Sequence, residues 1–366
     1  MSVIHALLHI LDEKQGSDLH LKVGAVPMIR VAGRLLKISD VELSQEKLEE
    51  IAKEVIGPSR WDSYQQQRDF DTALQIPQMG RYRVSAFFQR GQISLVLRKV
   101  KTEVPSIEEL LLPPLLKKIA LVDSGLIIVS GPTGCGKSST LAALVDCINQ
   151  QREAHILTIE DPIEFLHQDK KGRVSQREVG VDTKDFESAL RNCLRQDADV
   201  IVIGEMRDQT SMMVAMQAAE VGRVVMTTLH TTDAAGIVGR IMDLFPQNYQ
   251  EQVRVQLASV LRAGICQRLV PTSSQRPPLA PAVEVLVATP LVKKLIRENK
   301  LYKLYAAIET GGEFGMRTFN QSLLEMVNNH VITPEQAMDF SLHPEALRLN
   351  LQGIFLDESN RILQAD

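Results

Sequence analysis

The chain lacks the features of a secreted or membrane-spanning protein. Its four cysteines form no C-x-x-C pair, which argues against a zinc knuckle and gives no sign of a disulfide framework. No apolar stretch approaches the ~18 residues that a membrane-spanning helix needs. The N-terminal run has no basic segment and reaches Asp12 too early for a signal peptide. We therefore expect a cytoplasmic protein without direct membrane insertion, which reaches a membrane only through partners.

An excess of positive charge is also absent. The 41 Lys and Arg residues are outnumbered by 45 Asp and Glu residues, which gives a formal net charge of -4. There is thus no global basic field of the kind that drives non-specific nucleic-acid binding, and we expect no nucleic-acid partner. The 366 residues, 44% of them hydrophobic and 23% charged, suit a soluble globular protein of two or three domains.

One segment satisfies the phosphate-binding loop pattern G-x-x-x-x-G-K-[ST]. It follows the apolar run Leu126–Val129, and the residues after it carry apolar side chains at helical spacing as far as Gln151. This order of strand, glycine loop and helix indicates an ATP site in which Lys137 reaches the β- and γ-phosphates and Ser138 holds Mg²⁺. The predicted nucleotide-binding residues are Gly131, Pro132, Thr133, Gly134, Cys135, Gly136, Lys137, Ser138 and Ser139.

The pattern of apolar runs predicts the domain organisation. Four short apolar runs separated by helical stretches predict a parallel α/β sheet. We predict an α+β domain over 1–100, a linker over 101–110, an ATPase core over 111–285 and a helical region over 286–366. Within this frame Arg81–Phe88 and Ile93–Arg98 form a hairpin, Ser106 and Glu109 form a capping box that starts a helix, and Thr272–Pro281 is a surface loop.

Polar residues follow the predicted strands at the edge where open α/β sheets bind ligands. Glu160, Asp161 and Glu164 follow the second strand, Glu205 follows the third and His230 follows the fourth. Ser138, Glu160, Asp161 and Glu205 are the candidate magnesium ligands. Either Glu164 or Glu205 can be the general base, and the sequence does not decide between them.

These blocks resemble those of the secretion ATPase superfamily, and within it the type IV pilus retraction (PilT-like, twitching motility) ATPases. The resemblance rests on the phosphate loop, the segment around Glu164, the segment Gly204–Asp208 and the segment around His230. It implies a PAS-like N-terminal domain followed by a RecA-like ATPase domain, assembled as a homohexamer at the cytoplasmic side of the inner membrane. It also implies a membrane platform protein as partner and catalytic arginines from a neighbouring subunit, here Arg81, Arg83 and Arg98.

Some alternatives remain open at this point. Cys135 stands where the family usually has serine, Arg223 replaces a histidine, and Leu291–Glu298 matches the family's retraction motif only in part. The chain can therefore be a main retraction motor or an accessory paralogue with other pilus ATPases as partners. A RecA-like nucleic-acid or secretion translocase is a further alternative. A non-catalytic nucleotide-gated ring is disfavoured by the complete set of Lys137, Glu164, Glu205 and His230.

Overall fold

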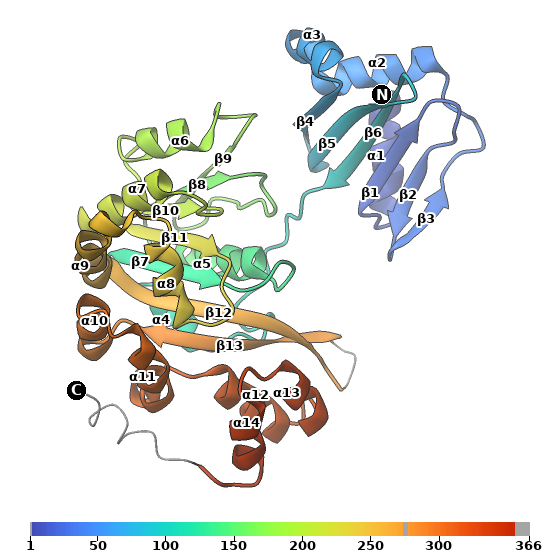
Figure 1. Cartoon of the computed structure of the whole chain (residues 1–366). Helices are drawn as coiled ribbons and strands as arrows, with labels where there is room; N and C mark the ends of the chain where they lie inside the picture. Colours follow the sequence, from blue (N-terminus) through green and yellow to red (C-terminus); the bar gives the residue numbers. More distant parts are fainter. Residues whose placement is uncertain (1, 274–276, 356–366) are drawn as a thin grey trace. The chain divides into compact units, whose positions relative to one another are not determined.

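The computed structural model describes residues 2–273 and 277–355, which form two compact units (Figure 1). The first unit contains the chain up to Glu103 together with Ile163–Leu166 and Gly180–Asp182. The second contains Val104–Pro162, His167–Val179 and the chain from Thr183 onward. Among the described residues, no helix is both long and apolar enough to cross a membrane.

The first unit is an antiparallel sheet with helices packed on it. The strand order is β3-β2-β1-β6-β5-β4, and every neighbouring pair is antiparallel. A core of buried side chains from α1, α2 and the inner strands holds it together. Its elements are α1 (Val3–Glu13), β1 (Asp18–Lys22), β2 (Met28–Val31), β3 (Arg34–Lys37), α2 (Gln45–Ile56), α3 (Pro58–Gln67), β4 (Asp69–Ile76), β5 (Gly80–Gln89) and β6 (Gln92–Lys99).

The predicted hairpin is confirmed as β5 and β6. Gln89 pairs with Gln92, so the turn consists of Arg90 and Gly91, both of which have positive φ. Such a two-residue turn matches the twist of the strands that it joins. Tyr82, Val84 and Ala86 of β5 face the core, whereas the alternate residues, including Arg81 and Arg83, are less buried.

The second unit contains the predicted parallel sheet. The strand order is β13-β12-β7-β11-β10-β8-β9, with every neighbouring pair parallel except β12 and β13. The four predicted strands are confirmed as β7, β8, β10 and β11. The strands are β7 (Gly125–Ser130), β8 (His155–Glu160), β9 (Arg173–Glu178), β10 (Val200–Ile203), β11 (Val224–Leu229), β12 (Leu261–Pro271) and β13 (Leu279–Val287).

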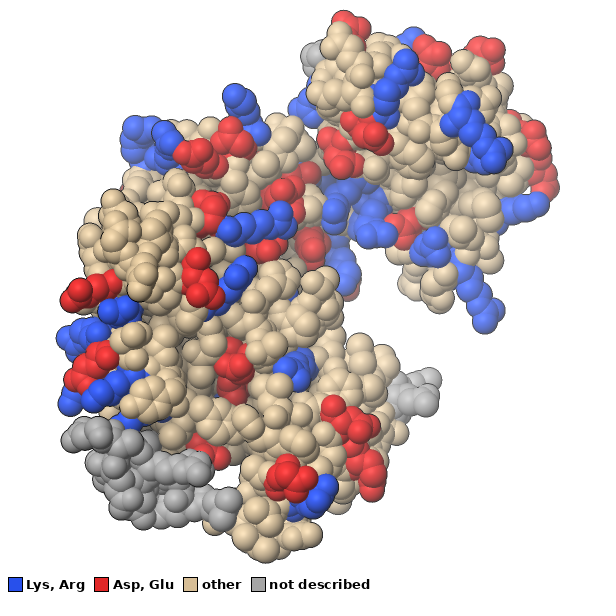
Figure 2. Space-filling model, in the orientation of Figure 1, with Lys and Arg blue, Asp and Glu red and all other residues tan. Residues whose placement is uncertain are grey.

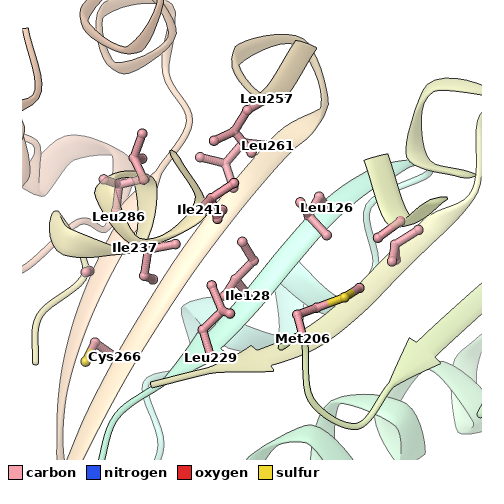
Figure 3. Close-up of a cluster of buried hydrophobic side chains, with 14 of the residues drawn as sticks. Leu126, Ile128, Met206, Leu229, Ile237, Ile241, Leu257, Leu261, Cys266 and Leu286 are labelled. Carbon is pink, nitrogen blue, oxygen red and sulfur yellow. The ribbon is translucent and has the colours of Figure 1, made fainter. Parts of the chain in front are cut away.

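Helices of the second unit cover both faces of this sheet. Leu126 and Ile128 of β7 belong to the core under α6 to α9 (Figure 3), whereas Ile127 and Val129 belong to the core under α4 and α5. The sheet is therefore buried on both sides, as parallel sheets usually are. The helices before β12 are α4 (Leu115–Ala120), α5 (Lys137–Gln151), α6 (Phe186–Cys193), α7 (Gln209–Glu220), α8 (Gly236–Met242), η1 (Gln247–Tyr249) and α9 (Gln250–Val260).

The region after β13 is helical, as the sequence predicts. A buried cluster joins these helices to one face of the sheet. On the face of this unit seen in Figure 2, Lys and Arg side chains lie among Asp and Glu side chains. The elements are α10 (Pro290–Arg297), η2 (Leu301–Lys303), α11 (Leu304–Thr310), η3 (Gly312–Phe314), α12 (Phe319–Asn328), α13 (Pro334–Phe340) and α14 (Pro344–Leu351).

One local prediction is wrong, and another is correct only in part. The Ser106 and Glu109 side chains form the reciprocal hydrogen bonds of a capping box, but the chain makes only turns there. Leu111 has a φ of 55°, and Pro113 follows with no N–H to continue a helix. The predicted loop Thr272–Pro281 is shorter than expected, because Leu279–Pro281 already belong to β13; its residues 274–276 lie outside the described part of the chain.

The four cysteines are free and buried. Their exposed fractions range from 0% for Cys266 to 8% for Cys147. Burial raises the pKa of each thiol, that of Cys193 to about 11 and that of Cys266 to about 12. These thiols are therefore uncharged at neutral pH and act as small apolar side chains.

Candidate functional site

The phosphate loop lies between β7 and α5, where the sequence places it. Gly131, Gly134 and Gly136 have φ values of 140°, 79° and 88°, a region that favours glycine. A Cβ on Gly131 would lie 2.4 Å from the Gln267 carbonyl oxygen and 2.7 Å from Cys135 Sγ. Only glycine fits at position 131, so the tight turn out of β7 is set by this residue.

Gln267 in β12 forms hydrogen bonds both to the glycine loop and to α5. Its Nε2 donates to the Cys135 carbonyl at 2.6 Å, and its Oε1 accepts from Thr140 Oγ1 at 2.7 Å. The residue is 2% exposed, so both hydrogen bonds are shielded from water. Gln267 thereby fixes the loop to the first turns of α5. The sequence alone does not reveal this role of Gln267, because nothing local marks a glutamine in a strand as a support for a distant loop.

Lys137 begins α5 and closes the loop on itself. Its Nζ donates to the carbonyl oxygens of Gly131 and Pro132 at 2.9 and 3.0 Å. The ammonium group therefore lies at the mouth of a loop whose residues Pro132, Thr133 and Gly134 are exposed. The N-terminus of the 15-residue helix α5 faces the same loop, and such an end favours anions. The glycine cradle, the lysine and the helix end together fit a polyphosphate.

Glu205 and His230 meet beyond the ends of adjacent strands. Glu205 follows β10 and His230 follows β11, and Glu205 Oε1 lies 3.2 Å from His230 Nε2. Thr228 Oγ1 donates to the Gly204 carbonyl at 2.6 Å, and the Met206 N–H donates to the Thr228 carbonyl at 3.2 Å. These two bonds fix the segment that carries Glu205 against the end of β11.

The surroundings of Glu205 keep it ionised. A hydrogen bond from Arg207 at 2.8 Å lowers the pKa of the Glu205 carboxyl, and the charge of Arg207 lowers it further, so that together they outweigh partial burial, which raises it. Lys137 follows β7, the neighbour of β11, and its positive charge also lowers the pKa of Glu205. Arg207 is a second residue that the sequence analysis left without a role. Its exposed guanidinium gives no pattern that separates it from a surface arginine.

The acidic residues after β8 differ in their environments. Glu160 Oε1 accepts hydrogen bonds from Thr158 Oγ1 at 2.6 Å and from Gln176 Nε2 at 3.0 Å. Asp161 is exposed. The hydrogen bond to Glu205 is the largest influence that raises the pKa of Arg207, and the negative charge of Asp161 raises that pKa further. A Cβ on Gly204 would lie 3.9 Å from the Asp161 backbone nitrogen, so Asp161 lies beside the segment that carries Glu205. One oxygen of Glu160, by contrast, is hydrogen-bonded to Gln176 of β9.

The predicted magnesium ligands come from three segments of the second unit. No group of three or more His, Cys, Asp and Glu side chains within the described ranges is arranged to hold a metal ion. Magnesium bound with a nucleotide needs only one or two protein carboxylates, since phosphate and water oxygens complete its shell. Ser138 with Asp161 or Glu205 offers oxygen atoms for that chemistry, and the assignment of all four residues, Glu160 included, stays a prediction.

The remaining predicted site residues belong to the first unit. Glu164 is exposed there, and Arg83 lies directly opposite Arg98 in the β5 and β6 pair. Arg98 Nε donates to Asp18 Oδ1 at 2.6 Å. Arg81 is 14% exposed in its side chain and lies 3.9 Å from Asp182. The roles of these four residues at a nucleotide remain predictions.

Asp18 is a buried carboxylate that the sequence analysis did not assign. Burial by itself would raise the pKa of Asp18, but hydrogen bonds from Ser17 and Arg98 outweigh it and lower the pKa. Asp18 is therefore charged at neutral pH and holds one of the three predicted catalytic arginines. Arg98 keeps 61% of its side chain exposed in this arrangement.

Comparison with known proteins identifies relatives over most of the chain. The profile of the family described as type II/IV secretion system protein matches residues 68–307. The type IV pilus retraction ATPase PilT of Pseudomonas aeruginosa is 40% identical over 91% of this chain and 96% of its own length. The type IV pilus ATPase PilU of the same organism is also 40% identical, over 94% of this chain and 90% of its own length.

A solved structure shows the same architecture. The crystal structure of the pilus retraction motor PilT with bound ADP superposes with a TM-score of 0.84 at 39% identity. The match covers 92% of this chain and 97% of the PilT chain. Both units described above are therefore included in the similarity.

Proposed function

We propose that this chain, a member of the type II/IV secretion system protein family, is an ATPase. In this proposal its hydrolysis of ATP drives type IV pilus retraction, the activity for which its relative PilT is named. One observation carries the proposal. Lys137 follows β7, His230 follows the neighbouring strand β11, and Glu205 follows β10 on the other side of β11, with its carboxylate 3.2 Å from His230. Phosphoryl transfer to water needs a cation that binds the phosphates and an ionised carboxylate that accepts a proton from the water, and Lys137 and Glu205 are such groups.

The loop and α5 bind the triphosphate in this proposal. Backbone N–H groups of the glycine loop and of the N-terminus of α5 donate hydrogen bonds to the phosphate oxygens, and Lys137 exchanges its two carbonyl partners for the β- and γ-phosphates. Ser138, with Asp161 or Glu205, would hold the magnesium ion. A bound magnesium ion supplies neutralisation of the negative charge on the phosphates during transfer.

Glu205 is the proposed general base. Its lowered pKa keeps the carboxylate ready to accept a proton from the attacking water at neutral pH. The water oxygen forms the new bond to the γ-phosphorus, and the bond to the leaving oxygen of ADP breaks with its electron pair. His230 lies 3.2 Å from Glu205 and, in this proposal, contacts the same phosphate. Glu164 stays as a second candidate for the base.

We further propose that the active ring is a homohexamer in which the first unit of each copy contacts the nucleotide that is bound to a neighbouring copy. Arg81, Arg83 and Arg98 then stabilise the transferring phosphoryl group held by the adjoining copy. The ring would lie in the cytoplasm at the inner membrane and bind a platform protein of the pilus machine. The arginines of β5 and β6 support this reading, because two of them face each other across a hairpin.

A second candidate is an accessory motor. The equal identity to PilT and to PilU favours neither role over the other. A nucleic-acid translocase is disfavoured by the formal charge of -4. Addition of DNA should leave the rate of ATP hydrolysis unchanged, and strong stimulation would support the translocase instead.

Gene deletion tests the proposed function. Pili of a strain without this gene should extend but no longer shorten, and a plasmid copy should restore shortening. A copy with Lys137→Ala should fail to restore it at equal protein levels, while Lys118→Ala, on the exposed side of α4, should succeed. Normal shortening in the deletion strain would instead assign the accessory role. ATP binding of equal affinity in the parent and in Lys137→Ala would contradict the nucleotide site itself.

A further inference from the structure

The loop that follows His230 is held at three successive points. Thr231 Oγ1 donates to Ser130 Oγ at 2.9 Å, directly before the glycine loop. The carbonyl oxygen of Thr232 accepts from Arg268 at 3.2 Å, and the N–H of Ala234 donates to Glu284 Oε1 at 2.6 Å. Residues 231–234 are therefore fixed both to β7 and to the β12–β13 hairpin.

Glu284 and Arg268, the two hairpin side chains that bind this loop, also contact the C-terminal helices. Glu284 Oε2 accepts from the N–H of Phe319, the first residue of α12, at 3.1 Å. The Arg268 guanidinium lies 5.2 Å from the centre of the Phe319 ring and 3.5 Å from the carbonyl oxygen of Phe340, which ends α13. Each side chain thus contacts the loop after His230 and the helices α12 or α13.

Strand register explains why these two residues act as a pair. Arg268 pairs with Ala282, and Cys266 pairs with Glu284, so Arg268 and Glu284 are diagonal neighbours on one face of the hairpin. The Arg268 charge lowers the pKa of Glu284, but burial is the larger influence and raises it to about 7. A carboxylate that is 1% exposed is costly unless it is hydrogen-bonded. Here the two N–H donors come from the two segments that it joins.

We propose that Glu284 and Arg268 are positioning residues that couple the loop after His230 to helices α12 and α13. A displacement of residues 231–234 when His230 responds to nucleotide would move the Glu284 carboxylate and, through it, the N-terminus of α12. The coupling rests on the proposed nucleotide site, but it assigns a distinct role to residues outside that site. It also gives the C-terminal helices a part in the motor cycle.

Hydrogen exchange of the full chain, with and without Mg²⁺ and ADP, tests the coupling. In the parent protein, ADP should change the exchange rates of peptides that cover 230–236 and 318–328. In Glu284→Gln the first response should remain and the second should be lost. Glu325→Gln is the matched control, because it removes a carboxylate from the exposed side of α12 without touching the loop. It should keep both responses.

The outcomes separate the coupling from the proposed function. ADP that binds, as measured by calorimetry, but leaves 318–328 unchanged in the parent would overturn the coupling alone. A parent-like response of 318–328 in Glu284→Gln would overturn it as well. Absence of ADP binding to the parent would show that the nucleotide site is wrong.

Kinetics supply a second readout with a conservative variant. Arg268→Lys keeps the positive charge but loses the forked contacts to Thr232 and Phe340. We expect kcat to fall by about 3- to 30-fold with the KM for ATP nearly unchanged, which is the size usual for coupling residues. A purely structural role predicts parent kinetics in the folded fraction. That result, in Arg268→Lys and Glu284→Gln alike, would contradict the coupling.

Discussion

Thr140 in α5 donates a 2.7 Å hydrogen bond to Gln267 in β12, across 127 residues of sequence. The other end of the Gln267 amide holds the Cys135 carbonyl. Gln267→Leu would leave two buried polar groups without partners, at a cost of about 1–3 kcal/mol each. We expect a lower thermal midpoint and weaker ADP binding, measured by calorimetry. Gln252→Leu, which replaces an exposed glutamine of α9, should change neither quantity. Parent-like ADP affinity in Gln267→Leu would show that the loop does not depend on this support.

Glu205→Gln should separate nucleotide binding from hydrolysis. The amide keeps the size of the side chain but cannot take the proton of the attacking water. We expect ATP to bind with near-parent affinity while steady-state phosphate release falls by about 10²–10⁴-fold. Glu187→Gln, which removes an exposed partner of Arg191, serves as the control and should turn over normally. Retained phosphate release in Glu205→Gln would shift the role of base to Glu164.

Arg207→Ala should change the pH dependence of hydrolysis. The Arg207 hydrogen bond is the largest influence that lowers the pKa of Glu205, so its loss should raise that pKa toward the ordinary value for glutamate. Because the base must be ionised, the acid limb of kcat should move to higher pH. A pH–rate profile measures this, with Arg195→Ala on the protein surface as the control. An unmoved acid limb would mean that Glu205 does not set it.

Arg83→Ala should act on the nucleotide of a neighbouring copy. This variant and Lys137→Ala should each be nearly inactive alone, since a catalytic arginine contributes about 10³–10⁵-fold in rate. Mixed rings contain some interfaces with an intact Lys137 and an intact Arg83, so mixing should recover part of the ATPase activity. Titration of one variant into the other measures the recovery. Lack of recovery at every ratio, with subunit exchange shown by a label, would count against a shared site.

Glu284 should make stability depend on pH. Its pKa is raised from 4.5 to about 7, so the folded protein binds the proton more tightly than the unfolded chain does. The carboxyl is therefore neutral and unstrained below its unfolded pKa, and stability falls as pH rises between about 4.5 and 7. The loss is at most about 3 kcal/mol.

Comparison with Glu284→Gln isolates that contribution. The thermal midpoint of the parent, relative to the variant, should decrease from pH 5 to pH 8, because glutamine does not titrate. Other nearby charges, Asp233 and Arg268 among them, are present in both proteins. A difference that stays constant over this range would mean that Glu284 has an ordinary pKa.

Local patterns predicted the centre of the second unit. β7, the glycine loop and α5 follow one another in sequence, so the apolar run, the glycines and the helical spacing suffice to place them. The strands β8, β10 and β11 can also be recognised in the sequence as short apolar runs, because strands buried on both faces need continuous apolar residues. Glu205 and His230 then fall at the same sheet edge by topology alone.

The missed elements depend on contacts between distant residues. β9 runs Arg173–Glu178 with mostly half-exposed polar residues, and its pairing with β8 rather than its composition makes it a strand. β12 follows α9 directly, with no turn residue to separate helix from strand. Gln267, Arg268 and Glu284 obtain their roles only when the hairpin that carries them lies against the loops after β7 and β11. No spacing rule reveals that arrangement.

The burial of all four native thiols has a practical consequence for experiments on this protein. A dye that reacts with accessible thiolates should leave these positions largely unmodified in the folded protein. One new cysteine on exposed Leu35 of β3 and another on exposed Tyr302 would then be labelled selectively. Energy transfer between the two dyes would follow the two units through each catalytic cycle, without first removing a cysteine.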